Sequence, residues 1–293
     1  MGTLRTLLHG IVDYAGLFPP AGLDLGPAVA EYSEHRVGPH RWALGRFVAP
    51  ATRLDAVGQA AERCFPTAAE PWRLTGLLGT DLPGDIAAVR RFNDAYHGRA
   101  VVDAVELRAA TPADIGRAVE IIGPGLETYV ELPVGSDLDP LIGAAGERGA
   151  RAKVRTGGIT PDAFPAPADL LRFIRTSVTA RVPFKATAGL HHPLRGSYPL
   201  TYAPDSSRAP MYGFLNVFLA ATFVASGLGE PEATALLTES SPAAFRFSDA
   251  TVEWRGHALG EAELGRARRE VATSFGSCSF REPIADLQTL GLL

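Results

Sequence analysis

The segments Arg151-Ala-Lys-Val-Arg-Thr-Gly-Gly158 and Val182-Pro-Phe-Lys-Ala-Thr-Ala-Gly-Leu-His-His192 are two short strand-like runs, and each contains one lysine. Lys153 and Lys185 are the only lysines among the 28 lysine and arginine residues of the chain. A buried amine with a shifted pKa cannot be replaced by a guanidinium, because arginine stays charged and is not a nucleophile. The two lysines are 32 residues apart, which is about the length of one βα unit. They therefore indicate a chemical role on two successive strands.

Outward from this pair, short apolar runs alternate with amphipathic segments, which is typical of a parallel-sheet α/β protein. The runs occupy residues 10–18, 45–50, 72–78, 99–107 and 127–132, followed by the two lysine segments, and an eighth strand or hairpin is expected within 245–254. The repeat of roughly 25–30 residues predicts a single (βα)8 TIM barrel over residues 1–293. An open doubly wound sheet ranks second, because no Gly-x-Gly-x-x-Gly fingerprint follows the first run.

Residues 193–241 form a longer connection than a barrel crossover needs. Its polar, proline-rich first part follows a lysine-bearing strand, so we expect a lid, although a structural insertion or an oligomer contact would fit the same pattern. The apolar run 211–228 is interrupted by Asn216 and glycines and lacks basic flanks, which favours a buried helix over a membrane span. Residues 274–293 are expected to form a C-terminal extension.

The composition excludes several classes of partner. The net charge is −4, with no basic stripe or acidic tail, which argues against nucleic acid or an anionic membrane. Cys64 and Cys278 are too few and too far apart for a disulfide framework, as expected for a protein of the reducing cytoplasm. The first residues lack the basic and apolar regions of a signal peptide. The expected partner is a small-molecule substrate, and the formation of a homo-oligomer stays open.

In a barrel of this type, functional side chains project from the C-terminal ends of the strands and the loops that follow. Lys153 and Arg155 share one side of their strand. Neighbouring strands lie about 4.8 Å apart, so two inward lysines could approach closely. Parity places Asp103 and Glu106 on opposite faces, and we expect Asp103 to face inward. The candidate site residues are Asp13, Asp103, Glu106, Glu131, Lys153, Arg155, Lys185, Thr187 and His191.

These residue types predict Schiff-base chemistry that needs no metal or organic cofactor. A second cation and an apolar wall both depress the pKa of an amine, which makes a lysine nucleophilic near neutral pH. A nearby carboxylate can then move protons to and from an imine. His191 and His192 lack the spacing of a metal site, which favours a polar substrate contact or a loop role. Cys278 has no assignable histidine or asparagine partner, so a buried thiol is expected.

Four motifs occur in order along the chain: Asp103 within Val-Val-Asp-Ala-Val, Glu131 at a strand end, Lys153-Val-Arg-Thr-Gly, and Phe-Lys185-Ala-Thr-Ala-Gly-Leu. Together they resemble the deoxyribose-phosphate aldolase family of class I aldolases. The first run, Val12-Asp-Tyr-Ala-Gly-Leu17, is similar to the opening motif of that family, and the resemblance covers roughly residues 10–192. It implies that Lys153 forms the imine, that Lys185 is the cation that lowers its pKa, and that Asp103 shuttles protons.

The sequence departs from that family at several positions. Arg155 stands where the family has a small hydroxyl residue beside the nucleophile. Leu190 replaces the second glycine after Lys185, and two histidines follow it. The phosphate loop of the eighth strand has no clear counterpart, and the segment 274–279 is a candidate substitute. The resemblance therefore implies a substrate that lacks the phosphate, or an acid that binds through Arg155.

The sequence is compatible with three functions. The first is a class I, metal-independent, aldolase-like lyase that acts on a small carbonyl or hydroxy-carbonyl compound. The second is proton abstraction next to a carboxylate by Lys153, Lys185, Glu106 and Glu131, with the help of Mg²⁺. The third is a barrel that binds a metabolite without chemistry, in which Lys153 forms only a buried ion pair, for instance with Glu131. The scarcity of lysine favours the first.

Overall fold

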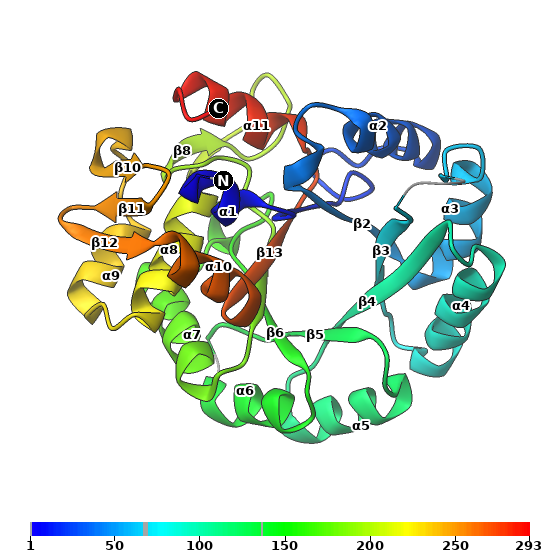
Figure 1. Ribbon diagram of the computed structural model, residues 1–293. Coiled ribbons are helices and arrows are strands. Elements are labelled where there is room, and N and C mark those ends of the chain that lie inside the picture. The colour runs from blue at the N-terminus through cyan, green and yellow to red at the C-terminus, as the bar shows by residue number, and fades with distance from the viewer. Residues whose placement is uncertain (1, 67–69, 136) are drawn as a thin grey trace.

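The structure, a computed structural model, describes residues 2–66, 70–135 and 137–293. Eight parallel strands close into a barrel in the order β1-β13-β7-β6-β5-β4-β3-β2, with helices around it (Figure 1). This confirms the predicted (βα)8 TIM barrel and excludes the open sheet. The barrel strands are β1 Val12–Tyr14, β2 Leu44–Pro50, β3 Trp72–Leu77, β4 Ala100–Arg108, β5 Glu127–Glu131, β6 Arg151–Arg155, β7 Phe184–Thr187 and β13 Ala272–Ser277.

The helices bury one face in the hydrophobic core around the barrel, and two of them begin at a clear local sequence signal. Asp81 and Thr111 show the local cause, since each side chain accepts a hydrogen bond from a backbone N–H group in the first turn of a helix that also contains a proline. The helices are α1 Thr3–Leu8, α2 Leu25–Val37, α3 Leu54–Ala61, α4 Leu82–Ala95, α5 Pro112–Ile122, α6 Leu138–Glu147, α7 Pro167–Ala180, α8 Phe214–Ala225, α9 Glu230–Leu237, α10 Glu261–Glu270 and α11 Arg281–Thr289. Short 3₁₀ helices span Arg41–Ala43, Ala51–Arg53, Pro161–Ala163 and Pro242–Ala244.

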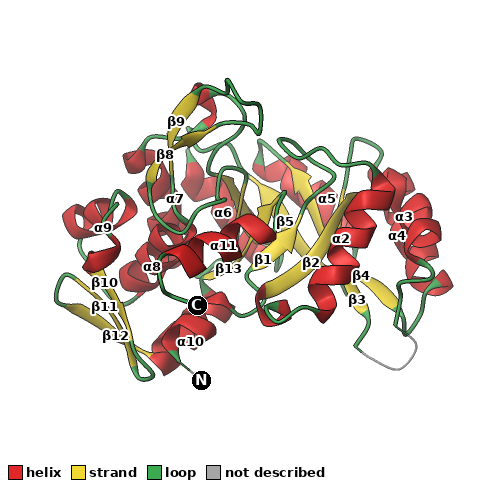
Figure 2. Ribbon diagram, turned by 90° about the horizontal axis from the view of Figure 1, so that it is seen from above, coloured by secondary structure: helices red, strands yellow, loops and turns green. Residues whose placement is uncertain are grey.

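The eighth barrel strand is β13, and the prediction that residues 245–254 supply it is wrong. That stretch forms β10 Phe245–Phe247 and β11 Thr251–Trp254, which pair with β12 His257–Gly260 in a separate antiparallel sheet. This sheet lies at the periphery, apart from the barrel strands (Figure 2). β13 pairs with both β1 and β7. Residues 274–293 are therefore not an extension, because they contain the end of a barrel strand and α11.

Only part of the predicted insertion at 193–241 lies at the barrel mouth. Its first half forms the hairpin of β8 Gly196–Pro199 and β9 Arg208–Met211, which has a small apolar cluster separate from the main core. Its second half contains α8, which is the buried helix expected from the run 211–228. α8 packs beside α7, α9 and α10 in the outer layer. Within the described ranges, no helix is both long and apolar enough to cross a membrane.

Candidate active site

Five charged side chains form a continuous series of ion pairs inside the barrel. Lys185 Nζ lies 2.5 Å from Asp13 Oδ2 and 2.6 Å from Glu106 Oε1. Lys153 Nζ lies 2.5 Å from Glu106 Oε2 and 2.8 Å from Glu131 Oε2. Negative and positive groups thus alternate from Asp13 to Glu131, and each buried charge has a partner of opposite sign.

The strand register brings the two lysines together. Lys153 lies opposite Lys185 in the β6–β7 pair and opposite Glu131 in the β5–β6 pair. The predicted placement of two inward lysines on neighbouring strands is confirmed. The expected ion pair between Lys153 and Glu131 is present as well, so access to the cavity, rather than pairing, separates the roles of the two lysines.

A cavity of about 880 Å³ opens at the C-terminal ends of the strands, and Lys153 forms part of its wall. Glu106 and Glu131 also line it, whereas its described lining includes neither Lys185 nor Asp13. Lys185 and Asp13 are each 1% exposed, against 5% for Lys153. Lys153 is therefore the amine that a small molecule can reach.

Asp13 supports the series from within the barrel. It accepts hydrogen bonds from Ser274 Oγ at 2.8 Å and from the backbone N–H of Arg46 at 2.8 Å, besides its ion pair with Lys185. These contacts replace the substrate contact expected for Asp13. They also commit Ser274, the first residue of the candidate phosphate loop 274–279, to a structural role.

The series shifts the pKa values of its members in opposite directions. Burial alone would raise the pKa of Glu106, but the ammonium groups of Lys153 and Lys185 outweigh it and hold the pKa at about 2. Burial alone would lower the pKa of Lys185, but Asp13 and Glu106 raise it above its ordinary value. Burial would also raise the pKa of Glu131, yet Lys153 lowers it. The carboxylates are therefore ionised at neutral pH, and Lys185 is a fixed cation.

Asp103 does not join the two lysines, which corrects the expected proton shuttle. The β3–β4 register jumps from Val102 to Ala104, so Asp103 is an extra residue on its strand. Its carboxylate lies in the first half of β4 and pairs with Arg46 and Arg73. The described lining of the cavity contains Glu106 and lacks Asp103. Glu106 takes the place that the sequence assigned to Asp103.

Two arginines and a threonine lie where the strands open into the cavity. Arg155 and Thr187 line it, as expected, and are register partners on β6 and β7. Arg108 at the end of β4 also lines it, and its Nε lies 2.9 Å from Glu131 Oε1. Arg108 was not among the site residues predicted from the sequence. Its position two residues after Glu106 could have identified it, because both share one side of β4.

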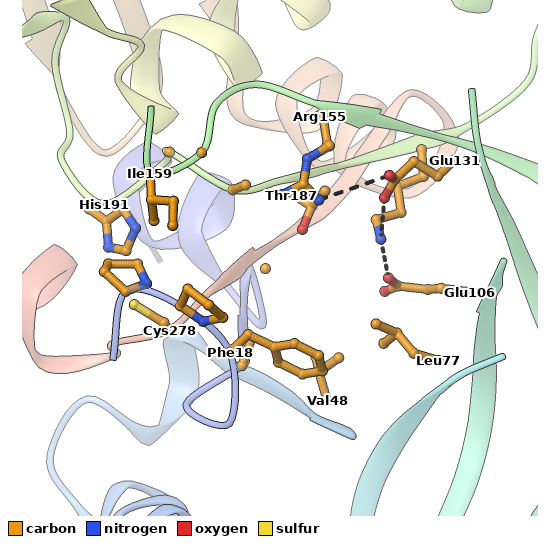
Figure 3. Close-up of a pocket in the computed structure, with 18 of the residues that line it drawn as sticks. Phe18, Val48, Leu77, Glu106, Glu131, Arg155, Ile159, Thr187, His191 and Cys278 are labelled. Carbon is orange, nitrogen blue, oxygen red and sulfur yellow. Dashed lines mark ion pairs between the residues drawn. The ribbon is translucent and has the colours of Figure 1, made fainter. Parts of the chain in front are cut away.

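Histidine–carboxylate pairs lie at the opposite end of the cavity. Figure 3 shows His191 and Cys278 across the cavity from Glu131 and Arg155. His191 Nδ1 lies 3.0 Å from Glu282 Oε2. His192 Nδ1 lies 2.6 Å from Asp286 Oδ2. Both carboxylates belong to α11, which the sequence analysis took as an extension, and no local signal identifies them. His191 therefore lines the cavity as predicted, but with a fixed carboxylate partner.

The hairpin of β8 and β9 closes over this wall. Tyr198 stacks on His192 with ring centroids 3.5 Å apart. The hydroxyl of Tyr202 donates to Glu282 and contacts Cys278 Sγ at 3.6 Å. Burial raises the pKa of the Cys278 thiol, in line with its expectation as an unreactive thiol. Among the described residues, no cluster of three histidine, cysteine or acidic side chains could hold a metal ion.

Comparisons with protein-family models and with curated proteins find no match for this sequence. The assignment of function therefore depends on the chemistry of the cavity.

Proposed function

We propose that the protein is a class I, Schiff-base, aldolase-like lyase that acts on a small carbonyl or hydroxy-carbonyl compound, with Lys153 as the imine-forming nucleophile. One observation carries this proposal. The amine of Lys153 lies in the wall of a large cavity, between two carboxylates that can move protons. Lys185 has no such access, and it balances the charge of Glu106 from the barrel interior.

The two carboxylates divide the proton transfers of imine formation. The ammonium of Lys153 first passes a proton to Glu131, and the free amine then attacks the carbonyl carbon. The resulting carbinolamine loses its hydroxyl group as water when a carboxylic acid returns a proton to that oxygen. The iminium ion that remains carries a positive charge between Glu106 and Glu131, and both carboxylates stabilise it.

Carbon–carbon cleavage follows from the same arrangement. A carboxylate removes the proton from the β-hydroxyl group of the bound hydroxy-carbonyl compound, and this oxygen becomes a carbonyl as the bond breaks. The bonding electrons move to the iminium nitrogen, which gives an enamine. Protonation of the enamine carbon and hydrolysis release the second product and restore Lys153. Each step uses only water and the groups that line the cavity.

The resemblance to deoxyribose-phosphate aldolase supports this proposal in a modified form. That family also has its imine-forming lysine on strand six and a second lysine on strand seven. In this chain, Glu106 serves as the carboxylate of strand four in place of Asp103. The proton-abstraction alternative with Mg²⁺ has less support, because the carboxylates of Glu106 and Glu131 already pair with Lys153.

The experiment that tests the proposal is hydrogen exchange at the carbon next to a carbonyl. Enamine formation exchanges these protons with solvent, so incubation of acetaldehyde, dihydroxyacetone or pyruvate in D₂O should give deuterium incorporation that depends on the protein. Proton NMR measures it. Exchange should persist with EDTA and should be lost in Lys153→Arg, which keeps the charge but cannot form an imine. Exchange that EDTA abolishes, or that Lys153→Arg retains, would contradict the proposal.

A further inference from the structure

The ion-pair series ends at the cavity with a surplus of positive charge. Glu131 binds Lys153 through Oε2, while its Oε1 lies 2.9 Å from Arg108 Nε and 3.9 Å from Arg155 Nη1. In the part of the chain that the structure describes, neither arginine pairs with another carboxylate. Three carboxylates thus face four cations, which are Asp13, Glu106 and Glu131 against Lys153, Lys185, Arg108 and Arg155.

The surplus charge lies beside the reactive amine. Arg108 ends β4 and Arg155 ends β6, so they flank Glu131 at the end of β5. Both arginines line the cavity, and their side chains are 75% and 46% exposed. Thr187 lies next to Arg155 and also lines the cavity, as Figure 3 shows. Two guanidinium groups and a hydroxyl group therefore open into the space that Lys153 reaches.

Solvated arginines at a barrel rim would need no such arrangement. Here both arginines already converge on the carboxylate of Glu131. The third cation that pairs with this carboxylate is the nucleophile, Lys153. The surplus is a single positive charge, which a monoanion would neutralise. A planar carboxylate also matches the forked donors of a guanidinium group.

We infer that Arg108, Arg155 and Thr187 form a subsite for a substrate carboxylate, and that the substrate is a short oxo acid with few carbon atoms between its carboxylate and the carbonyl that meets Lys153. This substrate class deepens the proposed function and rests on it for the fate of the carbonyl. Phe18, Leu77 and Ile159 contribute apolar surface elsewhere in the cavity and receive the rest of the substrate.

The subsite also connects substrate binding to activation of the nucleophile. Glu131 contacts Arg108 through one carboxylate oxygen and Lys153 through the other. A substrate carboxylate that binds Arg108 removes one of the cations that stabilise the charge of Glu131. Glu131 then becomes a stronger base toward the ammonium of Lys153.

A binding measurement tests the subsite without imine chemistry. In the Lys153→Arg background, isothermal titration calorimetry compares pyruvate with pyruvamide, its neutral analogue of similar size. We expect pyruvate to bind about tenfold to a hundredfold more tightly than pyruvamide, because charge-assisted hydrogen bonds are stronger than neutral ones. Arg108→Gln or Arg155→Gln should remove this preference, and Arg90→Gln, an exposed arginine of α4, should keep it. Equal affinities for pyruvate and pyruvamide would overturn the inference. Tighter binding of the dianion acetylphosphonate than of pyruvate would also overturn it, because the subsite would then prefer a phosphate-like group over a carboxylate.

A second measurement separates the inference from the proposed function. Borohydride reduction of the unmodified protein with pyruvate, and separately with pyruvamide, reports imine formation. If pyruvate binds more tightly than pyruvamide but forms no adduct, the carboxylate subsite is supported and the aldolase-like function is contradicted. If both compounds form adducts equally and bind with equal affinities, the aldolase-like function is supported and the carboxylate subsite is contradicted.

Discussion

Glu106 binds two ammonium groups at once, one through each carboxylate oxygen. We predict that Glu106→Gln, which keeps the shape, slows imine formation by about a hundredfold or more, because the amide can neither carry a proton nor balance two cations. Removal of one partner from a buried ion pair should also lower the free energy of unfolding by roughly 3 kcal/mol. Borohydride trapping rates and urea unfolding measure the two effects.

Asp103→Asn is the matched control on the same strand. Asp103 pairs with Arg46 and Arg73 away from the cavity, and Arg46 keeps a second partner in Glu127 at 3.1 Å. The substitution should reduce stability and leave the trapping rate within about twofold of the parent protein. A loss of trapping in Asp103→Asn, with retention in Glu106→Gln, would restore the assignment made from the sequence.

The same pairing predicts how stability depends on pH. The pKa of Glu106 is held at about 2 in the folded protein, against 4.5 ordinarily, so its contribution is complete above about pH 4.5 and is lost as the pH falls toward 2. The pKa of Lys185 is raised in the folded protein, so its effect on stability has the opposite pH dependence. Its contribution to the free energy of unfolding is complete below pH 10.5 and is lost at higher pH. Urea unfolding across this range should show a plateau, and Glu106→Gln should flatten its acid side. An unchanged acid side in this variant would contradict the assignment.

Residue spacing identified most of the site and failed at one carboxylate. Lys153, Arg155, Lys185 and Thr187 were predictable, because regular strands alternate their side chains and neighbouring lysines stay in register. Asp103 and Glu106 could not be separated in this way, since the irregularity at Asp103 breaks the alternation on β4. The partners of His191 and His192 lie on α11, and only the closure of the barrel brings them near.

We expect the hairpin of β8 and β9 to open separately from the barrel. Its apolar contacts form their own cluster of Leu200, Ala209 and Met211. Leu200→Ala should therefore raise the hydrogen-exchange rates of the hairpin amides by about tenfold or more and leave those of the barrel strands unchanged. Mass spectrometry of exchanged peptides measures this. Faster exchange across the barrel would show that the hairpin and barrel open together.

The wrong prediction of the eighth barrel strand has a physical explanation. Residues 245–254 alternate as a strand with one covered face does, and they form the expected hairpin, made of β10 and β11, but in a peripheral sheet. β13 has the sequence Ala-Thr-Ser-Phe-Gly-Ser, which lacks a continuous apolar run. Its small and polar residues suit a barrel interior that contains charges, where Ser274 binds Asp13. Patterns of hydrophobicity alone do not detect such a strand.

At the scale of the whole molecule, the C-terminal segment closes the barrel. Phe275 of β13 pairs with Val12 of β1 on one side and with Ala186 of β7 on the other. A chain truncated after residue 273 should lose cooperative unfolding, because open barrel edges and the buried charges of Asp13 and Lys185 would be exposed. A chain that ends at Thr289, after α11, should still unfold cooperatively. Circular dichroism during thermal unfolding distinguishes the two, and a cooperative transition in the shorter chain would contradict the topology.

The location of the imine shows which of the two lysines is the nucleophile. The chain contains two lysines, which belong to different tryptic peptides, so borohydride reduction with pyruvate or acetaldehyde followed by peptide mass spectrometry assigns any adduct to one of them. We expect an adduct on Lys153, because it lines the cavity while Lys185 is buried between Asp13 and Glu106. An adduct on Lys185, or none on either lysine with any short aldehyde, ketone or oxo acid, would contradict it.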